Sequence, residues 1–255
     1  QRLLAHLDMD WSLHVNEHNS GSPCRQWLNG AARATGDFVW IAEADDLTLP
    51  GFLEVTLPAF HDRDVVMSYC QSQQMAGDGA ILCPHYLDYV ADIDAEKWRS
   101  NHIAGGRDEI RGVLAVKNTI PNVSACVFRR DALVGALQAH IEDIAQYRIA
   151  GDWATYVRVL ERGKIAFSAQ PLNLHRRHER SVTVGSFNEK LLREILSMQH
   201  AVHERFGATR RAEATARTYA QELYVQFGLA SADAPQVFAN PAFAAYWSAE
   251  RLAAE

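Results

Sequence analysis

The sequence GDFVWIAEADD, Gly36–Asp46, predicts more about this protein than any other stretch of the chain. It contains the continuous apolar run Phe38–Ala42, which is typical of a β-strand buried on both faces. Three carboxylates follow within four positions, at Glu43, Asp45 and Asp46. Ligands in open α/β sheets bind at the carboxyl ends of strands, so we expect a functional site here.

The spacing of these carboxylates indicates a metal site. Carboxylates packed this closely repel one another unless a cation lies between them. Mg²⁺ or Mn²⁺ takes one or two protein carboxylates and fills its other positions with water and phosphate oxygens. The alternative interpretation is a solvated acidic turn that caps the following helix.

The pattern on both sides of this stretch predicts an α/β fold. Apolar runs of strand length alternate with helical patterns through about residue 175, which indicates a sheet covered by helices. The predicted strands are 11–15, 38–42, 65–69, 124–128 and 164–167. The predicted helices are 23–34, 49–60, 131–140 and 152–162.

The tail of the chain has a different character. Apolar residues recur every three or four positions over 187–206 and again over 212–227, which predicts two amphipathic helices. Asn240 followed by Pro241 predicts the start of a third helix. We therefore expect two parts, a sheet domain at 1–185 and a helical extension at 186–255, with the apolar stripes packed on the sheet domain or on a partner.

Composition excludes several classes of protein. The chain has 255 residues and a net charge of −6, which argues against a nucleic-acid partner. Its four cysteines form no CxxC pair, so a thiolate zinc site is not expected and a reduced, cytosolic compartment fits. No apolar stretch reaches the ~20 residues of a membrane span. The first residue is not Met, so we expect the chain to be part of a longer protein with other domains.

The segment Asn19–Asp46 resembles glycosyltransferase family 2. The family pattern is an N-x-G loop, a helix ending in A-x-G-[DE], an apolar strand and D-x-D-D, here read as EADD. The resemblance implies a GT-A fold, an inverting mechanism and a role in bacterial polysaccharide synthesis. It also implies that Glu43 lies near the nucleotide ribose, that Asp45 coordinates the metal, and that Asp46 contacts the donor or a metal-bound water. Glu43 departs from the usual first Asp of this motif.

A second acidic position opens the predicted helix at 152–162. From the residues alone, Asp152 is as well explained by an N-cap. The resemblance implies instead that Asp152 is the general base, since the motif carries an Asp before an aromatic residue and a G-[KR]-[IV] strand. Gly151 stands where the family often has Glu. By resemblance, Asn122 and Trp153 are expected on the acceptor side of the cleft, and a turn that enters a strand explains Asn122 equally well.

The segment 174–183, LHRRHERSVT, is too rich in histidine and arginine to belong to a core. A solvated basic loop would explain it. Arginines also pair with phosphate, and a neutral imidazole can complete a metal shell. By resemblance we expect His178 on the metal, with His175 as the rival ligand, and Arg177 and Arg176 on the donor phosphates.

Together these features predict a metal-dependent glycosyltransferase that uses Mn²⁺ or Mg²⁺. Its expected donor is a nucleotide-diphosphate sugar, and its expected acceptor is a glycan or lipid-linked glycan. We expect it in the cytoplasm, or peripherally associated with the inner face of the membrane. One alternative is a non-catalytic GT-A-like scaffold within a larger synthase, because the family's opening strand and helix are absent here. A nucleotidyltransferase is a weaker alternative, since no Gly-rich phosphate loop is visible.

Overall fold

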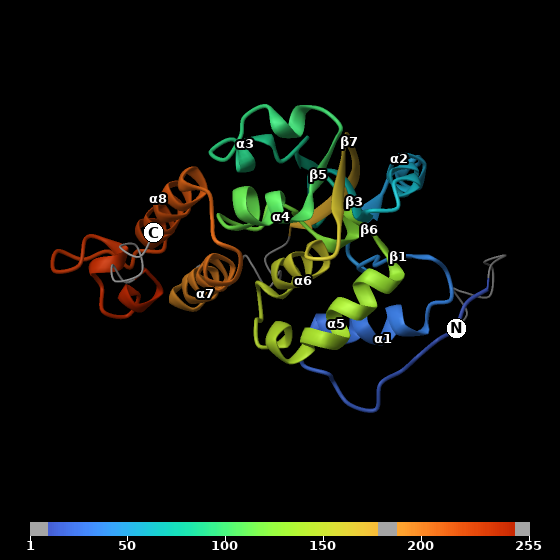
Figure 1. Ribbon diagram of the computed structural model, residues 1–255, viewed down its shortest axis with the longest axis horizontal. Coiled ribbons are helices and arrows are strands. Elements are labelled where there is room, and N and C mark those ends of the chain that lie inside the picture. The colour runs from blue at the N-terminus through green and yellow to red at the C-terminus, as the bar shows by residue number, and fades with distance from the viewer. Residues whose placement is uncertain (1–9, 178–187, 248–255) are drawn as a thin grey trace.

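The computed structural model describes residues 10–177 and 188–247, and it centres on a mixed β-sheet flanked by helices (Figure 1). The strand order is β1-β6-β3-β7-β2, with β4 beside β3 and β5 beside β7. β3 and β7 pair in parallel and all other pairs are antiparallel. The predicted α/β fold, a mixed sheet flanked by helices, is therefore confirmed. The strands are β1 (Phe38–Trp40), β2 (Leu47–Thr48), β3 (Val65–Ala76), β4 (Ile81–Cys83), β5 (His102–Gly105), β6 (Cys126–Arg129) and β7 (Lys164–Arg177).

Helices cover both faces of this sheet, and the C-terminal helices form one end of the molecule. Figure 1 shows α7 and α8 at one end of the molecule and α2 at the other. The α-helices are α1 (Pro23–Arg33), α2 (Phe52–Thr56), α3 (Leu87–Val90), α4 (Gly106–Glu109), α5 (Arg130–Ala145), α6 (Gly151–Leu160), α7 (Glu189–Phe206) and α8 (Arg210–Gln226). A wider turn, Ile110–Leu114, continues α4, and short 3₁₀ turns lie at Leu57–His61, Lys97–Arg99, Val123–Ala125, Val237–Ala239 and Ala244–Trp247.

The core is divided by the sheet because alternate strand residues point to opposite faces. In β6, Cys126 and Phe128 join the large cluster beneath α5, α6 and the C-terminal helices, while Val127 joins a smaller one. That smaller cluster contains Phe52 and Phe60, which bring α2 and the turn after it onto the second face. The sheet is thus covered on both sides, and its functional edge lies where the strands end.

β1 is an edge strand, which corrects the prediction that 38–42 is buried on both faces. Among the described residues it pairs only with β6, and only Val39 of its three residues is buried. Trp40 is 38% exposed and donates its indole N–H to the Ser124 carbonyl at 2.9 Å. The apolar run is thus explained by packing on one face and an indole anchored at the rim.

Three further expectations are corrected. No strand forms at 11–15, where Trp11 and Val15 are 42% and 76% exposed, because a strand needs a ladder partner and none pairs there. The helix predicted over 49–60 is split into α2 and a 3₁₀ turn, because Pro58 has no backbone N–H. Pro241 starts no α-helix within the described residues; a 3₁₀ turn follows at Ala244–Trp247.

The two helices predicted in the tail are present and packed. Leu192, Leu196, Ala216 and Tyr224 have no exposed surface and belong to the same cluster as the sheet's core. Asn188 caps α7 by accepting hydrogen bonds from two backbone N–H groups of its first turn. None of the helices in the described residues is long and apolar enough to cross a membrane.

Candidate active site

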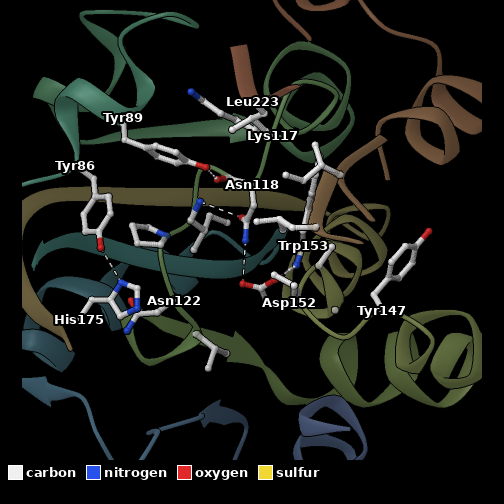
Figure 2. Close-up of a pocket in the computed structure, with 18 of the residues that line it drawn as sticks. Tyr86, Tyr89, Lys117, Asn118, Asn122, Tyr147, Asp152, Trp153, His175 and Leu223 are labelled. Atoms are coloured by element: carbon white, nitrogen blue, oxygen red, sulfur yellow. Dashed lines mark hydrogen bonds between the residues drawn. The ribbon is translucent and has the colours of Figure 1, made fainter. Parts of the chain in front are cut away.

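A cavity of about 780 Å³ opens between the sheet's edge, the N-terminus of α6 and the C-terminal helices (Figure 2). It is bordered by loops that follow β1, the Ile110–Leu114 turn and α5, together with the end of β7. Most of the predicted site residues meet at this cavity although they are far apart in the sequence. Those on its wall are Glu43, Asn122, Asp152, Trp153, His175 and Arg177.

The acidic cluster forms immediately after β1, as predicted. Glu43, Asp45 and Asp46 each place one carboxylate oxygen within 4.8 Å of the others. Desolvation, together with the nearby charges of Asp46 and Asp45, raises the pKa of Glu43 to about 7. The backbone N–H of Glu43 is fixed by a 3.1 Å hydrogen bond to the Ser124 hydroxyl. The carboxylates are thus held together against their mutual repulsion.

Asp46 is anchored by two residues from distant parts of the chain. Its Oδ2 accepts a hydrogen bond from the side-chain amide of Asn122 at 2.5 Å. Its Oδ1 accepts the backbone N–H of Arg176 at 2.9 Å. Asn122 is itself buried and accepts a 2.8 Å hydrogen bond from Asn173. Asn122 therefore holds the acidic loop in place through Asp46, a contact that the sequence did not predict.

Arg176 holds the same loop through its guanidinium group. Nε donates to the Asp45 carbonyl at 2.6 Å, and one terminal nitrogen donates to the carbonyls of Ala76 and Gly77 at 3.1 and 2.9 Å. Two of its nitrogens thus donate to backbone carbonyls, and the expected contact of Arg176 with donor phosphates stays a prediction. Arg177, the next residue, lines the cavity.

Asp152 lies in the first turn of α6 and faces the cavity. Its Oδ2 accepts a 2.9 Å hydrogen bond from the Asn118 side chain, and Oδ1 accepts the Trp153 backbone N–H at 2.7 Å. The N-cap of α6 is Ala150, so the simple capping role for Asp152 is not observed. Desolvation raises the pKa of Asp152 to about 6, and the hydrogen bonds from Trp153 and Asn118 act in the opposite direction. A carboxylate with this pKa is ionised at neutral pH and is a better proton acceptor than an exposed one.

Glu194, on α7, binds the loop that leads into α6 and reaches its N-cap residue Ala150. Its two carboxylate oxygens accept the backbone N–H groups of Arg148, Ile149 and Ala150 at 3.1, 2.8 and 3.0 Å. Helix N-termini carry unpaired N–H groups and a partial positive charge, so a carboxylate stabilises them. The extension thus fixes the helix that carries Asp152. Sequence reasoning missed Glu194 because it looks like any polar residue on an amphipathic helix.

Only residues 174–177 of the basic segment 174–183 lie in the part of the chain that the structure describes. His175 and Arg177 belong to the end of β7, which continues well past the predicted strand at 164–167 because β3 pairs with it throughout. The Nδ1 atom of His175 lies 2.7 Å from the Tyr86 hydroxyl. Desolvation lowers the pKa of His175 to about 4, so its imidazole is neutral at pH 7. His178, the expected metal ligand, lies outside the described residues.

Trp153 contributes mainly to the core. Its side chain is 2% exposed, and the indole N–H donates to the Leu114 carbonyl at 3.0 Å. Gly151 is also constrained, because a Cβ at this position would lie 3.0 Å from the Cys24 sulfur. The glycine is therefore explained by close packing against α1, because any Cβ here would require the Cys24 side chain to shift.

No protein-family model matches the chain, and no curated protein matches it. Among solved structures, it is similar to a crystal structure of S. aureus TarS 1–349 in complex with UDP, with a TM-score of 0.48 and 12% sequence identity. The match covers 82% of this chain and 54% of that one, so the chain spans about half the length of that structure. This likeness assigns no activity to the chain.

Proposed function

We propose that this protein is a metal-dependent glycosyltransferase that moves a sugar, with inversion, from a nucleotide-diphosphate donor to a sugar hydroxyl. The observation that carries the proposal is the joint presence of two kinds of carboxylate at one cavity. Glu43 brings the acidic cluster to its wall, and Asp152, with a pKa raised to about 6, lies on the same wall. A phosphate-binding metal and a proton acceptor are the two groups that this reaction requires.

The carboxylates of the acidic cluster suit a hard divalent cation. Glu43, Asp45 and Asp46 supply carboxylate oxygens, the ligands that Mg²⁺ and Mn²⁺ prefer. Asp45 and Glu43 are the proposed ligands, and Asp46 anchors the loop that carries them through its hydrogen bonds to Asn122 and Arg176. When bound, such a cation neutralises the negative charge that develops on a departing diphosphate. Neutral His175 and cationic Arg177 lie on the cavity wall, where Arg177 suits phosphate binding.

Asp152 is the proposed general base. It takes the proton of the acceptor hydroxyl, whose oxygen forms the new bond to the anomeric carbon. The bond from that carbon to the diphosphate breaks, and its electron pair leaves with the diphosphate. Because attack and departure occur on opposite faces, one displacement inverts the anomeric centre. Asn118 and the Trp153 N–H hold the carboxylate in position for this transfer.

The proposal is tested by nucleotide binding and turnover in the full chain. We expect calorimetry to show binding of UDP or GDP in the presence of Mn²⁺ and a marked loss of affinity with EDTA. A panel of UDP- and GDP-sugars should include at least one whose diphosphate is released, slowly with water and faster with an added sugar acceptor.

A non-catalytic scaffold would behave differently in both assays. It binds no nucleotide diphosphate in a metal-dependent way and releases none from any sugar nucleotide. That result with well-folded protein would overturn the glycosyltransferase proposal.

A further inference from the structure

The cavity continues beyond Asp152 into a region where α8 faces α3 and the loop at Lys117. We call this region the α8 lobe. In Figure 2, Lys117 and Leu223 lie above Asp152 while His175 lies to its left, so the two walls flank the carboxylate on different sides. The residues that define the α8 lobe are Tyr89, Asp92, Lys117, Tyr219, Glu222 and Leu223.

The one lysine of the lobe is neutralised by its neighbours. Lys117 Nζ lies 2.8 and 2.9 Å from the two carboxylate oxygens of Asp92. It also lies 4.5 Å from the ring centre of Tyr89 and 4.7 Å from that of Tyr219. Its side chain is 6% exposed. The ammonium group is therefore fully engaged and does not offer a site for an anion.

The remaining charge of the lobe is negative. Glu222 is an exposed residue of α8 and lines the cavity, and no described cation other than Lys117 belongs to the lobe. Arg148 and Arg177 also line the cavity, but they come from the α5–α6 loop and the end of β7. An anionic ligand would thus meet repulsion here, whereas an uncharged ligand would not.

The chemistry of this wall suits a polyhydroxylated ring. The C–H face of a sugar is apolar and packs on aromatic and aliphatic side chains, such as Tyr219 and Leu223. Its hydroxyls donate hydrogen bonds to carboxylate and amide oxygens, which Glu222 and Gln226 supply from the same helix. The loop also connects directly to the proposed base, because the Tyr89 hydroxyl donates to the Asn118 carbonyl and the Asn118 side chain donates to Asp152.

We propose that the α8 lobe is the acceptor subsite and that it takes a neutral sugar unit. The inference rests on the proposed function, since it places the acceptor hydroxyl at Asp152. It assigns the C-terminal helices a role in substrate choice: α8 provides Tyr219, Glu222 and Leu223 to one wall. The donor side of the cavity is left to the acidic cluster and the end of β7.

The test is glycoside binding by saturation-transfer NMR with the full chain. The neutral probes are the methyl glycosides of glucose, galactose and N-acetylglucosamine, and the anionic probe is methyl glucuronide. Leu223→Trp fills the lobe from a buried position, and Glu222→Trp fills it from an exposed one. Val225→Trp is the matched control, because Val225 lies on the same helix and is 57% exposed. UDP and GDP binding with Mn²⁺ is measured on the same four proteins.

We expect at least one neutral glycoside to give saturation transfer with the wild type and with Val225→Trp. Both filling variants should lose that signal, the glucuronide should give none, and nucleotide affinity should be equal in all four proteins. If circular dichroism shows that Leu223→Trp does not fold, Glu222→Trp decides, since its position is tolerant of a large side chain.

Three results would overturn the assignment of the α8 lobe as the acceptor subsite. They are equal glycoside signals in the filling and control variants, no signal from any neutral glycoside, or a stronger signal from the glucuronide. Each leaves the proposed function standing when Mn²⁺-dependent nucleotide binding is intact. Conversely, a wild type that binds a neutral glycoside in the lobe but no nucleotide supports a sugar site there, contradicts the glycosyltransferase and overturns the acceptor role of the lobe.

Discussion

The side-chain amide of Asn118 donates a 2.9 Å hydrogen bond to Oδ2 of Asp152. This bond stabilises the ionised carboxylate, whereas desolvation at the first turn of α6 favours the protonated form. Desolvation is the larger effect, so the pKa of Asp152 rises to about 6. The balance sets how much of the proposed base is ionised near neutral pH.

Asp152→Asn should reduce sugar transfer by about 10²–10⁴-fold, the usual contribution of a general base. Asn keeps the shape of the side chain, and its carbonyl oxygen can still accept the Trp153 N–H, so the fold should survive. The affinity for nucleotide diphosphate and Mn²⁺ should stay unchanged, because a base acts on the acceptor proton. Calorimetry beside a transfer assay checks both. Asp143→Asn is the control, since that side chain is 68% exposed on α5. Near-normal turnover in the Asp152 variant would exclude Asp152 as the general base.

The pH profile of kcat/KM should have an acidic limb near pH 6, because Asp152 must be ionised to accept a proton. Asn118→Ala removes a hydrogen bond to the ionised form, so the pKa should rise and the limb should move to higher pH. Glu194→Gln removes a nearby negative charge that raises the pKa, so the limb should move to lower pH. Shifts of the two variants in the same direction would contradict this assignment.

The double variant Glu43→Gln, Asp45→Asn should lose Mn²⁺ binding, measured by the electron paramagnetic resonance signal of free Mn²⁺. The free energy of unfolding without metal should not fall, because the substitutions relieve repulsion between adjacent carboxylates. Asp78→Asn, an exposed acid on the β3–β4 turn, is the control. Equal Mn²⁺ binding in the double variant and the control would exclude this cluster as the metal site. Asp46 is left intact, since it anchors the loop to Asn122 and Arg176.

Leu192→Ala should lower the free energy of unfolding by about 2–5 kcal/mol, the usual cost of a cavity in a packed core. Leu192 lies on α7 with no exposed surface and belongs to the same cluster as the sheet's core. Val225→Ala on α8, 57% exposed, should change it by less than about 0.5 kcal/mol. Urea denaturation of both variants measures this. A small effect at Leu192 would show that α7 contributes little to the folded core.

The sequence was sufficient where a local pattern carried the information. The apolar residues before Glu43 and the carboxylates after them predicted a strand ending at an acidic cluster, and the structure forms both. The stripes over 187–206 and 212–227 predicted α7 and α8, because helical periodicity is a property of neighbours along the chain. Asp152 was identified as a candidate through its motif, and its catalytic role remains a prediction.

The position of β1 was not predictable in this way. An apolar run shows that side chains will be buried, but it does not show how many strands lie beside it. Within the part of the chain that the structure describes, β1 has one neighbouring strand, so Trp40 lies at the rim and donates to the Ser124 carbonyl, 84 residues away. Similarly, the pairing of β7 with β3 draws His175 and Arg177 into a strand that their own sequence suggested was a loop.

The amino-acid sequence by itself determined the α/β class, the acidic cluster after β1 and the amphipathic helices of the tail. Only the tertiary structure decided which groups support these features: Asn122 and Arg176 on Asp46, and Glu194 on the helix that carries Asp152. Those contacts join residues 76, 130 and 44 positions apart. Periodicity and spacing describe short stretches, whereas the closure of the cavity depends on how distant elements pack against one another.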